Sequence, residues 1–91
     1  GIIIMKIGII GLGAVGTANK EGFQFLGHTV ISHDIKLDTK IQDIFDTEIA
    51  FLCVPTPQNE DGSCNTSIIE NVIKELNEKK AAILRIAAFL Y

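Results

Sequence analysis

The stretch KIGIIGLGAVG, residues 6–16, decides the fold expected for this 91-residue chain. It begins as an apolar run without polar alternation, which is typical of a strand buried on both faces of a parallel sheet. It ends in three glycines, Gly11, Gly13 and Gly16. In the pattern G-x-G-x-x-G the first glycine permits a tight turn, the second lets a diphosphate approach the main chain, and the third lets a helix pack closely on the strand. The stretch therefore predicts a strand, a phosphate-binding turn and a helix.

Outward from this turn, strands and helices alternate along the chain. Apolar and β-branched runs predict strands at residues 2–10, 29–32, 48–54 and 81–88. Helical spacing predicts helices at 14–26, which Gly27 would end, and from Thr66 or Ser67 to about 78, with a weak helix within 36–45. Alternation of this kind predicts an α/β fold with right-handed crossovers. We expect a Rossmann-like parallel sheet of about four strands in the order 3-2-1-4, flanked by helices, with residues 1–91 forming a single partial domain.

Composition narrows the class of partner. The chain is 47% hydrophobic, carries a net charge of −3 and has a pI near 5.2. Nucleic acid and anionic membranes call for a basic face, so neither is expected as a partner. Cys53 and Cys64 have no metal-ligand or disulfide spacing. The two lone cysteines favour a reduced cytoplasm, and the apolar start lacks a basic leader and is too short to span a bilayer.

Asp34 follows the second predicted strand. An acidic residue at this place in a dinucleotide fold accepts hydrogen bonds from the hydroxyls of the adenosine ribose. A 2′-phosphate there would face a like charge. The sequence therefore favours NAD over NADP.

Two histidines and two cysteines are the remaining residues suited to catalysis, and their places in the sequence do not predict a catalytic site. His28 follows the glycine that ends the first helix, and His33 flanks the expected ribose site. Cys53 lies in a buried strand, and Cys64 lies in a polar loop without a charge that would activate it. No catalytic residue and no metal ligand is predicted.

The stretch FLCVPTPQNEDGS, residues 51–63, narrows the interpretation. Together with GLGAVG and Asp34 it resembles the N-terminal NAD-binding domain of the UDP-glucose/GDP-mannose dehydrogenase family. These NAD enzymes oxidise a nucleotide-sugar alcohol to a uronate in two steps. The likeness runs from about Met5 to Arg85, and the Val-Pro-Thr-Pro element distinguishes it from other dinucleotide-binding families.

The resemblance implies roles for particular residues. Asp34 would bind the adenosine ribose. The family places a basic residue shortly after this aspartate. Lys40 is the first candidate for this residue and Lys36 is the other, and the choice between them stays open. The diphosphate would lie against Gly11, Leu12, Gly13, Ala14, Val15 and Gly16. The cofactor cleft would be lined by Val54, Pro55 and Thr56.

Two departures from the family pattern stand in the second half of the chain. Asn65 replaces an acidic residue, and residues 85–89 read RIAAF where the family usually reads Arg-Ser-Thr-Val-Pro. The family's catalytic cysteine and its supporting lysine and asparagine would all lie beyond residue 91. We therefore expect the ADP half of NAD to be held, the nicotinamide half to be poorly fixed, and no turnover by this chain alone. A gene fragment, a frame-shifted product and a stand-alone module all remain open.

Two alternatives from other classes remain. One is a non-catalytic nucleotide-sensing domain, which shares the glycine turn and the acidic residue but usually has Gly-Asp-Ala after the third strand. The other is an NAD(P) enzyme of the hydroxyacid or phosphogluconate type. In each case the apolar segment Ile83 to Tyr91 predicts a homo-oligomer, because an apolar edge strand invites pairing with a second chain.

Overall fold

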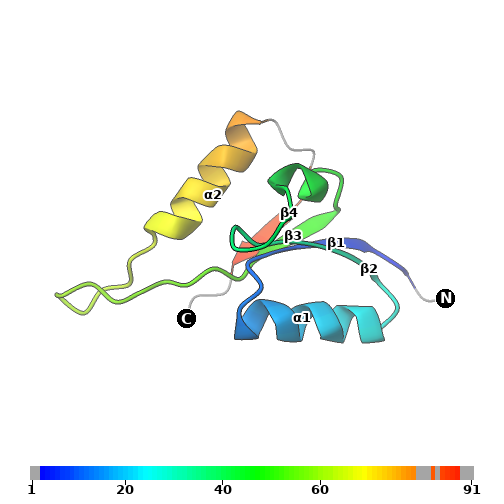
Figure 1. Cartoon of the computed structure of the whole chain (residues 1–91), viewed down its shortest axis with the longest axis horizontal. Coiled ribbons are helices and arrows are strands. Elements are labelled where there is room, and N and C mark those ends of the chain that lie inside the picture. The colour runs from blue at the N-terminus through cyan, green and yellow to red at the C-terminus, as the bar shows by residue number, and fades with distance from the viewer. Residues whose placement is uncertain (1–2, 80–82, 84, 89–91) are drawn as a thin grey trace.

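The computed structural model describes residues 3–79, 83 and 85–88 as four parallel strands, two α-helices and one 3-10 helix. In Figure 1, α1 covers one face of the sheet, and α2 and the 3-10 helix η1 cover the other. The elements are β1 (Lys6–Ile10), α1 (Ala14–Phe25), β2 (Thr29–His33), η1 (Ile41–Ile44), β3 (Ile49–Leu52), α2 (Ser67–Glu78) and β4 (Arg85–Ala88).

The Rossmann-like α/β class is confirmed, but the strand order differs from the one expected. The sheet runs β2-β1-β3-β4 instead of 3-2-1-4, so the third strand lies on the far side of β1 from β2. Burial explains the placement: Ala50 and Leu52 of β3 are fully buried, whereas β2 begins at exposed Thr29 and ends in the polar Ser32 and His33. An apolar strand is stabilised more by a central position. The topological switch point therefore lies between β1 and β3.

Each face of the sheet has its own hydrophobic core. Alternate residues of β1 divide between the two faces, so that Ile7 and Ile9 pack toward α1 while Ile10 packs toward η1 and α2. On the first face, the rings of Phe23 and Phe51 stack with centroids 5.1 Å apart. The core on the second face contains Ile10, Ile41, Ile44, Ala50, Leu52, Val54, Ile69 and Leu76.

Several element boundaries differ from the sequence predictions. Regular β1 begins at Lys6, and Ile3 and Ile4 before it are exposed. The helix expected within 36–45 shrinks to η1 because Thr39 closes a turn: its hydroxyl accepts a hydrogen bond from the Asp34 N–H and donates one to the Asp34 carbonyl. Residues 81, 82 and 84 of the fourth predicted strand lie outside the described residues.

Both α-helices have clear local end signals. Gly27 follows Leu26, the C-cap residue of α1. Its φ is +91°, the left-handed conformation predicted for the glycine that ends this helix. His28 comes next, and its Nδ1 accepts a hydrogen bond from the Met5 N–H at 3.0 Å, which ties the end of α1 to the start of β1. At the start of α2 the cap residue is Thr66, but the Oδ1 of Asn65 accepts the Ser67 N–H.

No helix among residues 3–79, 83 and 85–88 has the length and apolar character needed to cross a membrane.

Candidate functional site

The glycine turn between β1 and α1 has the geometry that its sequence predicts. Gly11 has φ +96°, and a Cβ placed on it would lie 2.6 Å from the Cys53 carbonyl oxygen. A Cβ on Gly16 would overlap the Gly11 carbonyl. The first and third glycines therefore have the predicted steric roles, because only hydrogen fits where the turn, β3 and α1 meet.

The second glycine opens the helix to solvent. Gly13 is the N-cap residue of α1, it is exposed, and no side chain caps the helix there. The first N–H groups of an α-helix have no intrahelical acceptor and carry the positive end of the helix dipole. The first turn of α1 holds no acidic residue that would neutralise this end. The turn can therefore accept an anion on main-chain N–H groups alone.

Asp34 is hydrogen-bonded to this turn. Its Oδ2 accepts the Leu12 N–H at 2.7 Å, and its Oδ1 accepts the Lys36 N–H at 2.9 Å. The hydrogen bonds from Lys36 and then Leu12 hold the pKa of the Asp34 carboxyl below its ordinary value. The carboxylate thus stays charged and is fixed beside the place where a diphosphate would rest.

One cavity of about 660 Å³ joins the glycine turn, Asp34 and α2, a size that suits a small-molecule site. Its lining includes six of the residues that the sequence predicts for the cofactor site: Gly11, Leu12, Gly13, Asp34, Val54 and Pro55.

The other predicted site residues lie outside the lining of this cavity. Ala14 and Gly16 lie in the first turn of α1, Val15 packs against the core on the α1 face, and Thr56 is buried. Lys40 is exposed at the start of η1, whereas Lys36, the second basic candidate, lines the cavity.

Sequence reasoning missed one wall of the cavity, which is formed by α2. Ile68, Asn71, Val72 and Glu75 share one face of this helix and line the cavity, opposite Ile41 of η1. Their spacing of three and four residues was visible in the sequence. The spacing alone did not predict that this face would line a cavity, because that depends on η1 and α2 lying on the same side of the sheet (Figure 1).

The lining of the cavity also includes Cys53 and His33, for which the sequence predicts no catalytic role. Cys53 is 1% exposed, and burial raises the pKa of its thiol, which opposes formation of a reactive thiolate. His33 lies beside Thr39, with 2.9 Å between His33 Nδ1 and the Thr39 hydroxyl oxygen. Within the described part of the chain no cluster of His, Cys, Asp or Glu is arranged to hold a metal ion.

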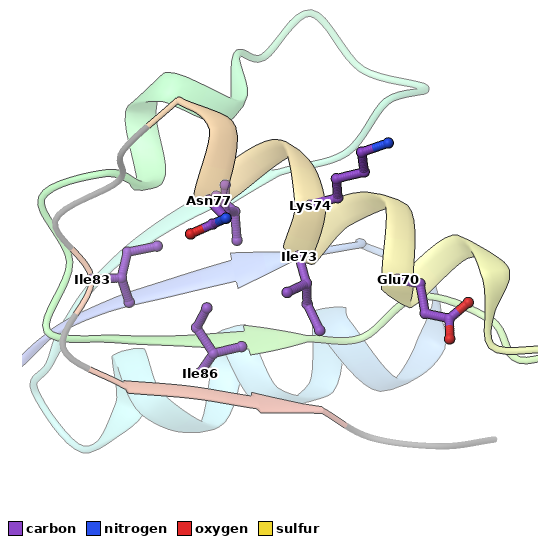
Figure 2. Close-up of a pocket in the computed structure, with 7 residues that line it drawn as sticks. Glu70, Ile73, Lys74, Asn77, Ile83 and Ile86 are labelled. Atoms are coloured by element: carbon purple, nitrogen blue, oxygen red, sulfur yellow. The ribbon is translucent and has the colours of Figure 1, made fainter.

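A second hollow of about 500 Å³ lies between α2 and β4, as Figure 2 shows. Ile73 of α2 and Ile86 of β4 reach into it and stay 42% and 44% exposed. Glu70 and Lys74 add one charge of each sign to its lining. The described residues that line this hollow do not include the glycine turn, which lines the larger cavity instead.

Comparison with known proteins agrees with this geometry. A search of the solved structures matched a UDP-glucose dehydrogenase from the hyperthermophilic archaeon Pyrobaculum islandicum, with a TM-score of 0.75 and 15% sequence identity. The match covers all of this chain and 38% of that chain, so this chain spans well under half the length of the enzyme it resembles. At this identity the likeness establishes the fold. No curated protein sequence matched the chain.

A family model gives the sequence-level evidence. Residues 36–84, more than half of the chain, match the NAD binding domain of the UDP-glucose/GDP-mannose dehydrogenase family. The matched range contains the Val-Pro-Thr-Pro element and α2, and the glycine turn precedes it. The chain therefore belongs to the UDP-glucose/GDP-mannose dehydrogenase family, in the part that forms its NAD-binding domain.

Proposed function

We propose that this chain binds NAD through its ADP half in the cavity between the glycine turn, Asp34 and α2, as the cofactor domain of a nucleotide-sugar dehydrogenase. The observation that carries the proposal is the 2.7 Å hydrogen bond between the Leu12 N–H and Asp34 Oδ2. This bond holds the Asp34 carboxylate against the glycine turn, and both line one cavity, which supports adjacent binding of a ribose and a diphosphate.

The chemistry of the donor set fits the ADP half of NAD. The diphosphate would accept hydrogen bonds from the main chain at Gly13 and the first turn of α1. Each Asp34 oxygen accepts one main-chain N–H and keeps further lone pairs, because a carboxylate offers about four acceptor sites. The ribose hydroxyls can therefore donate to Asp34 without displacing its existing bonds.

The same arrangement favours NAD over NADP. A 2′-phosphate would lie against the Asp34 carboxylate, whose lowered pKa keeps it charged at neutral pH. Lys36 lines the same cavity, and its charge can offset only part of the repulsion because its exposed side chain is screened by water.

We expect these 91 residues alone to hold the cofactor without transferring hydride. Hydride transfer requires a substrate carbon held close to the nicotinamide ring. Cys53, the one thiol in the cavity lining, is a buried group with a raised pKa, so a nucleophilic role for it is not expected. The nucleotide-sugar oxidation of the family is accordingly proposed for the whole enzyme.

Calorimetric titration of the chain with NAD, NADP, ADP and ATP tests the proposal. NAD should bind more tightly than NADP. Asp34→Asn should lower the affinity for NAD by about 10-fold to 100-fold, because a charge-assisted hydrogen bond contributes about 1.5–3 kcal/mol to binding. Asp38→Asn is the matched control, since Asp38 is an exposed acid of the same loop outside the cavity lining. Preference for ATP over NAD would indicate the nucleotide-sensing alternative, and equal loss in both variants would contradict the assigned role of Asp34.

A further inference from the structure

The wall that α2 contributes to the cavity is chemically unlike the glycine turn. It presents two apolar side chains, Ile68 and Val72, and two polar ones, Asn71 and Glu75. Ile41 of η1 and Ile35 of the loop after β2 face the same space. Ile35 is 91% exposed, so its apolar surface is accessible to a ligand in this cavity. Apolar walls with a few polar groups between them suit a flat, nitrogen-rich ring.

The polar groups of this wall have unused hydrogen-bonding capacity. The Oε1 of Glu75 accepts the Lys79 ammonium at 2.9 Å, and its Oε2 has no hydrogen bond to any residue that the structure describes. The Asn71 amide has no side-chain hydrogen bond within the same described residues. Lys79 also offsets the negative charge of Glu75, so an uncharged ring can approach Glu75 without a bare anion beside it.

We propose that Glu75, together with Asn71, reads the amino edge of the adenine ring of the dinucleotide. The inference rests on the proposed function, since the diphosphate on the glycine turn and the ribose on Asp34 leave the α2 end of the cavity for the base. An asparagine amide matches adenine through a paired contact with the 6-amino group and the neighbouring ring nitrogen. A carboxylate only accepts hydrogen bonds, so it suits the adenine amino group.

Replacing adenine by hypoxanthine separates the two side chains. Hypoxanthine carries an oxygen in place of the 6-amino group, and an amide can meet that oxygen with its NH₂ group. At the edge formed by position 6 and N7, hypoxanthine offers only acceptors, so the Glu75 carboxylate finds no donor there. Glu75 therefore determines the preference for adenine, and Asn71 strengthens binding of either base.

The test compares NAD with nicotinamide hypoxanthine dinucleotide by calorimetry, using the whole chain. Base-edge contacts discriminate by about 5-fold to 150-fold, and about tenfold is expected in a cavity this open. Glu75→Gln should bring the ratio of the two affinities close to one, because a glutamine amide can both accept and donate. Asn71→Ala should weaken both dinucleotides by a similar factor.

Glu78→Gln is the matched control. Glu78 lies on the same helix, makes an exposed ion pair with Lys74, and is outside the cavity lining. The Glu78→Gln variant should leave the ratio of the two dinucleotide affinities unchanged, although this substitution also removes an ion pair. A ratio near one in the unsubstituted chain, with NAD still bound, would overturn the role of Glu75 and leave the proposed function standing. Failure of NAD itself to bind would overturn both. A ratio that falls equally in the Glu75 and Glu78 variants would assign the effect to the charge of α2 instead.

Discussion

Asp34 and the glycine turn are joined to each other by main-chain hydrogen bonds before any ligand is considered. The Asp34 carboxylate accepts N–H groups from Leu12 and Lys36, and Thr39 holds the backbone of Asp34 from the other side. Ordering these groups during folding removes part of the entropy cost that binding would otherwise carry. The groups of the proposed NAD site are therefore already ordered by these bonds.

The Asp34 bonds should give the protein a specific dependence on pH. The folded-state pKa of Asp34 is lowered from its ordinary value of 3.8, so its contribution to stability is present above that pH and is lost as pH falls through the folded pKa. The difference in unfolding free energy between the chain and Asp34→Asn should be constant near neutral pH and shrink below about pH 4. Denaturant unfolding at several pH values measures it.

Asp61 titrates in the same range, since hydrogen bonds from the Ser63 hydroxyl and N–H lower its pKa as well. It is present in both proteins, so its contribution cancels in the difference. A difference that stays constant down to pH 2 would contradict the role assigned to the Asp34 carboxylate.

Two glycines of α1 should respond in opposite directions to the same substitution. A Cβ on Gly16 would overlap the Gly11 carbonyl, whereas a Cβ on Gly22 meets no atom within 4 Å. Gly16→Ala should destabilise the fold by at least about 1–3 kcal/mol, as overpacking does. Gly22→Ala should stabilise it by about 0.5–1 kcal/mol, because alanine loses less entropy in a helix. Thermal unfolding of both variants checks the pair, and similar changes in both would show that α1 does not pack closely on the turn.

At the scale of elements, α2 contributes to the core, to the larger cavity and to the hollow beside β4. Ile69 and Leu76 are buried in the core, Asn71 and Glu75 line the larger cavity, and Ile73 lines the hollow beside β4. Three faces of one 12-residue helix are thus in use. The α1 helix, by contrast, serves mainly through its first turn and the single face that packs on the sheet.

The division of α2 into faces predicts unequal effects from one chemical change. Ile69 is 6% exposed and Ile73 is 42% exposed. Ile69→Ala should lower the free energy of unfolding by about 2–5 kcal/mol, as buried isoleucine truncations do. Ile73→Ala should cost much less, because much of its side chain is already in water. Denaturant titration of the two variants measures the difference, and equal losses would mean that the helix is rotated from the position described.

At the scale of the whole molecule, the sheet order brings the site together. Crossing from β2 to β3 on the far side of β1 places the ends of β1, β2 and β3 next to one another. Residues distant in sequence, such as Leu12, Asp34 and Pro55, then line one cavity. Open α/β sheets place ligands at this kind of switch point.

We expect self-association of the chain at the hollow between α2 and β4. Among the described strands β4 pairs only with β3, and exposed Ile73 and Ile86 lie beside that edge. Glu70 and Lys74 give the hollow both charges, so a two-fold copy could oppose unlike ones. Residues 84 and 89–91 of the segment expected to form the interface lie outside the described residues.

Sedimentation at several concentrations tests this expectation. The chain should associate, and Ile73→Glu should shift it toward the monomer while leaving its stability nearly unchanged, as surface substitutions usually do. Phe25→Glu is the control, since Phe25 is 91% exposed at the end of α1 on the opposite face of the sheet. A monomer at all concentrations would contradict the prediction, and dissociation by Phe25→Glu alone would move the interface to α1.

The amino-acid sequence by itself determined the features that depend on neighbouring residues. Glycines at fixed spacing after an apolar run specify the β1 turn, and Gly27 ends α1, because each acts through backbone sterics within a few residues. The tertiary structure alone decided that β3 lies beside β1, that Thr39 leaves only a short η1, and that α2 lines the larger cavity. These features depend on which apolar faces are buried together, and that competition among distant segments has no local signature in the chain.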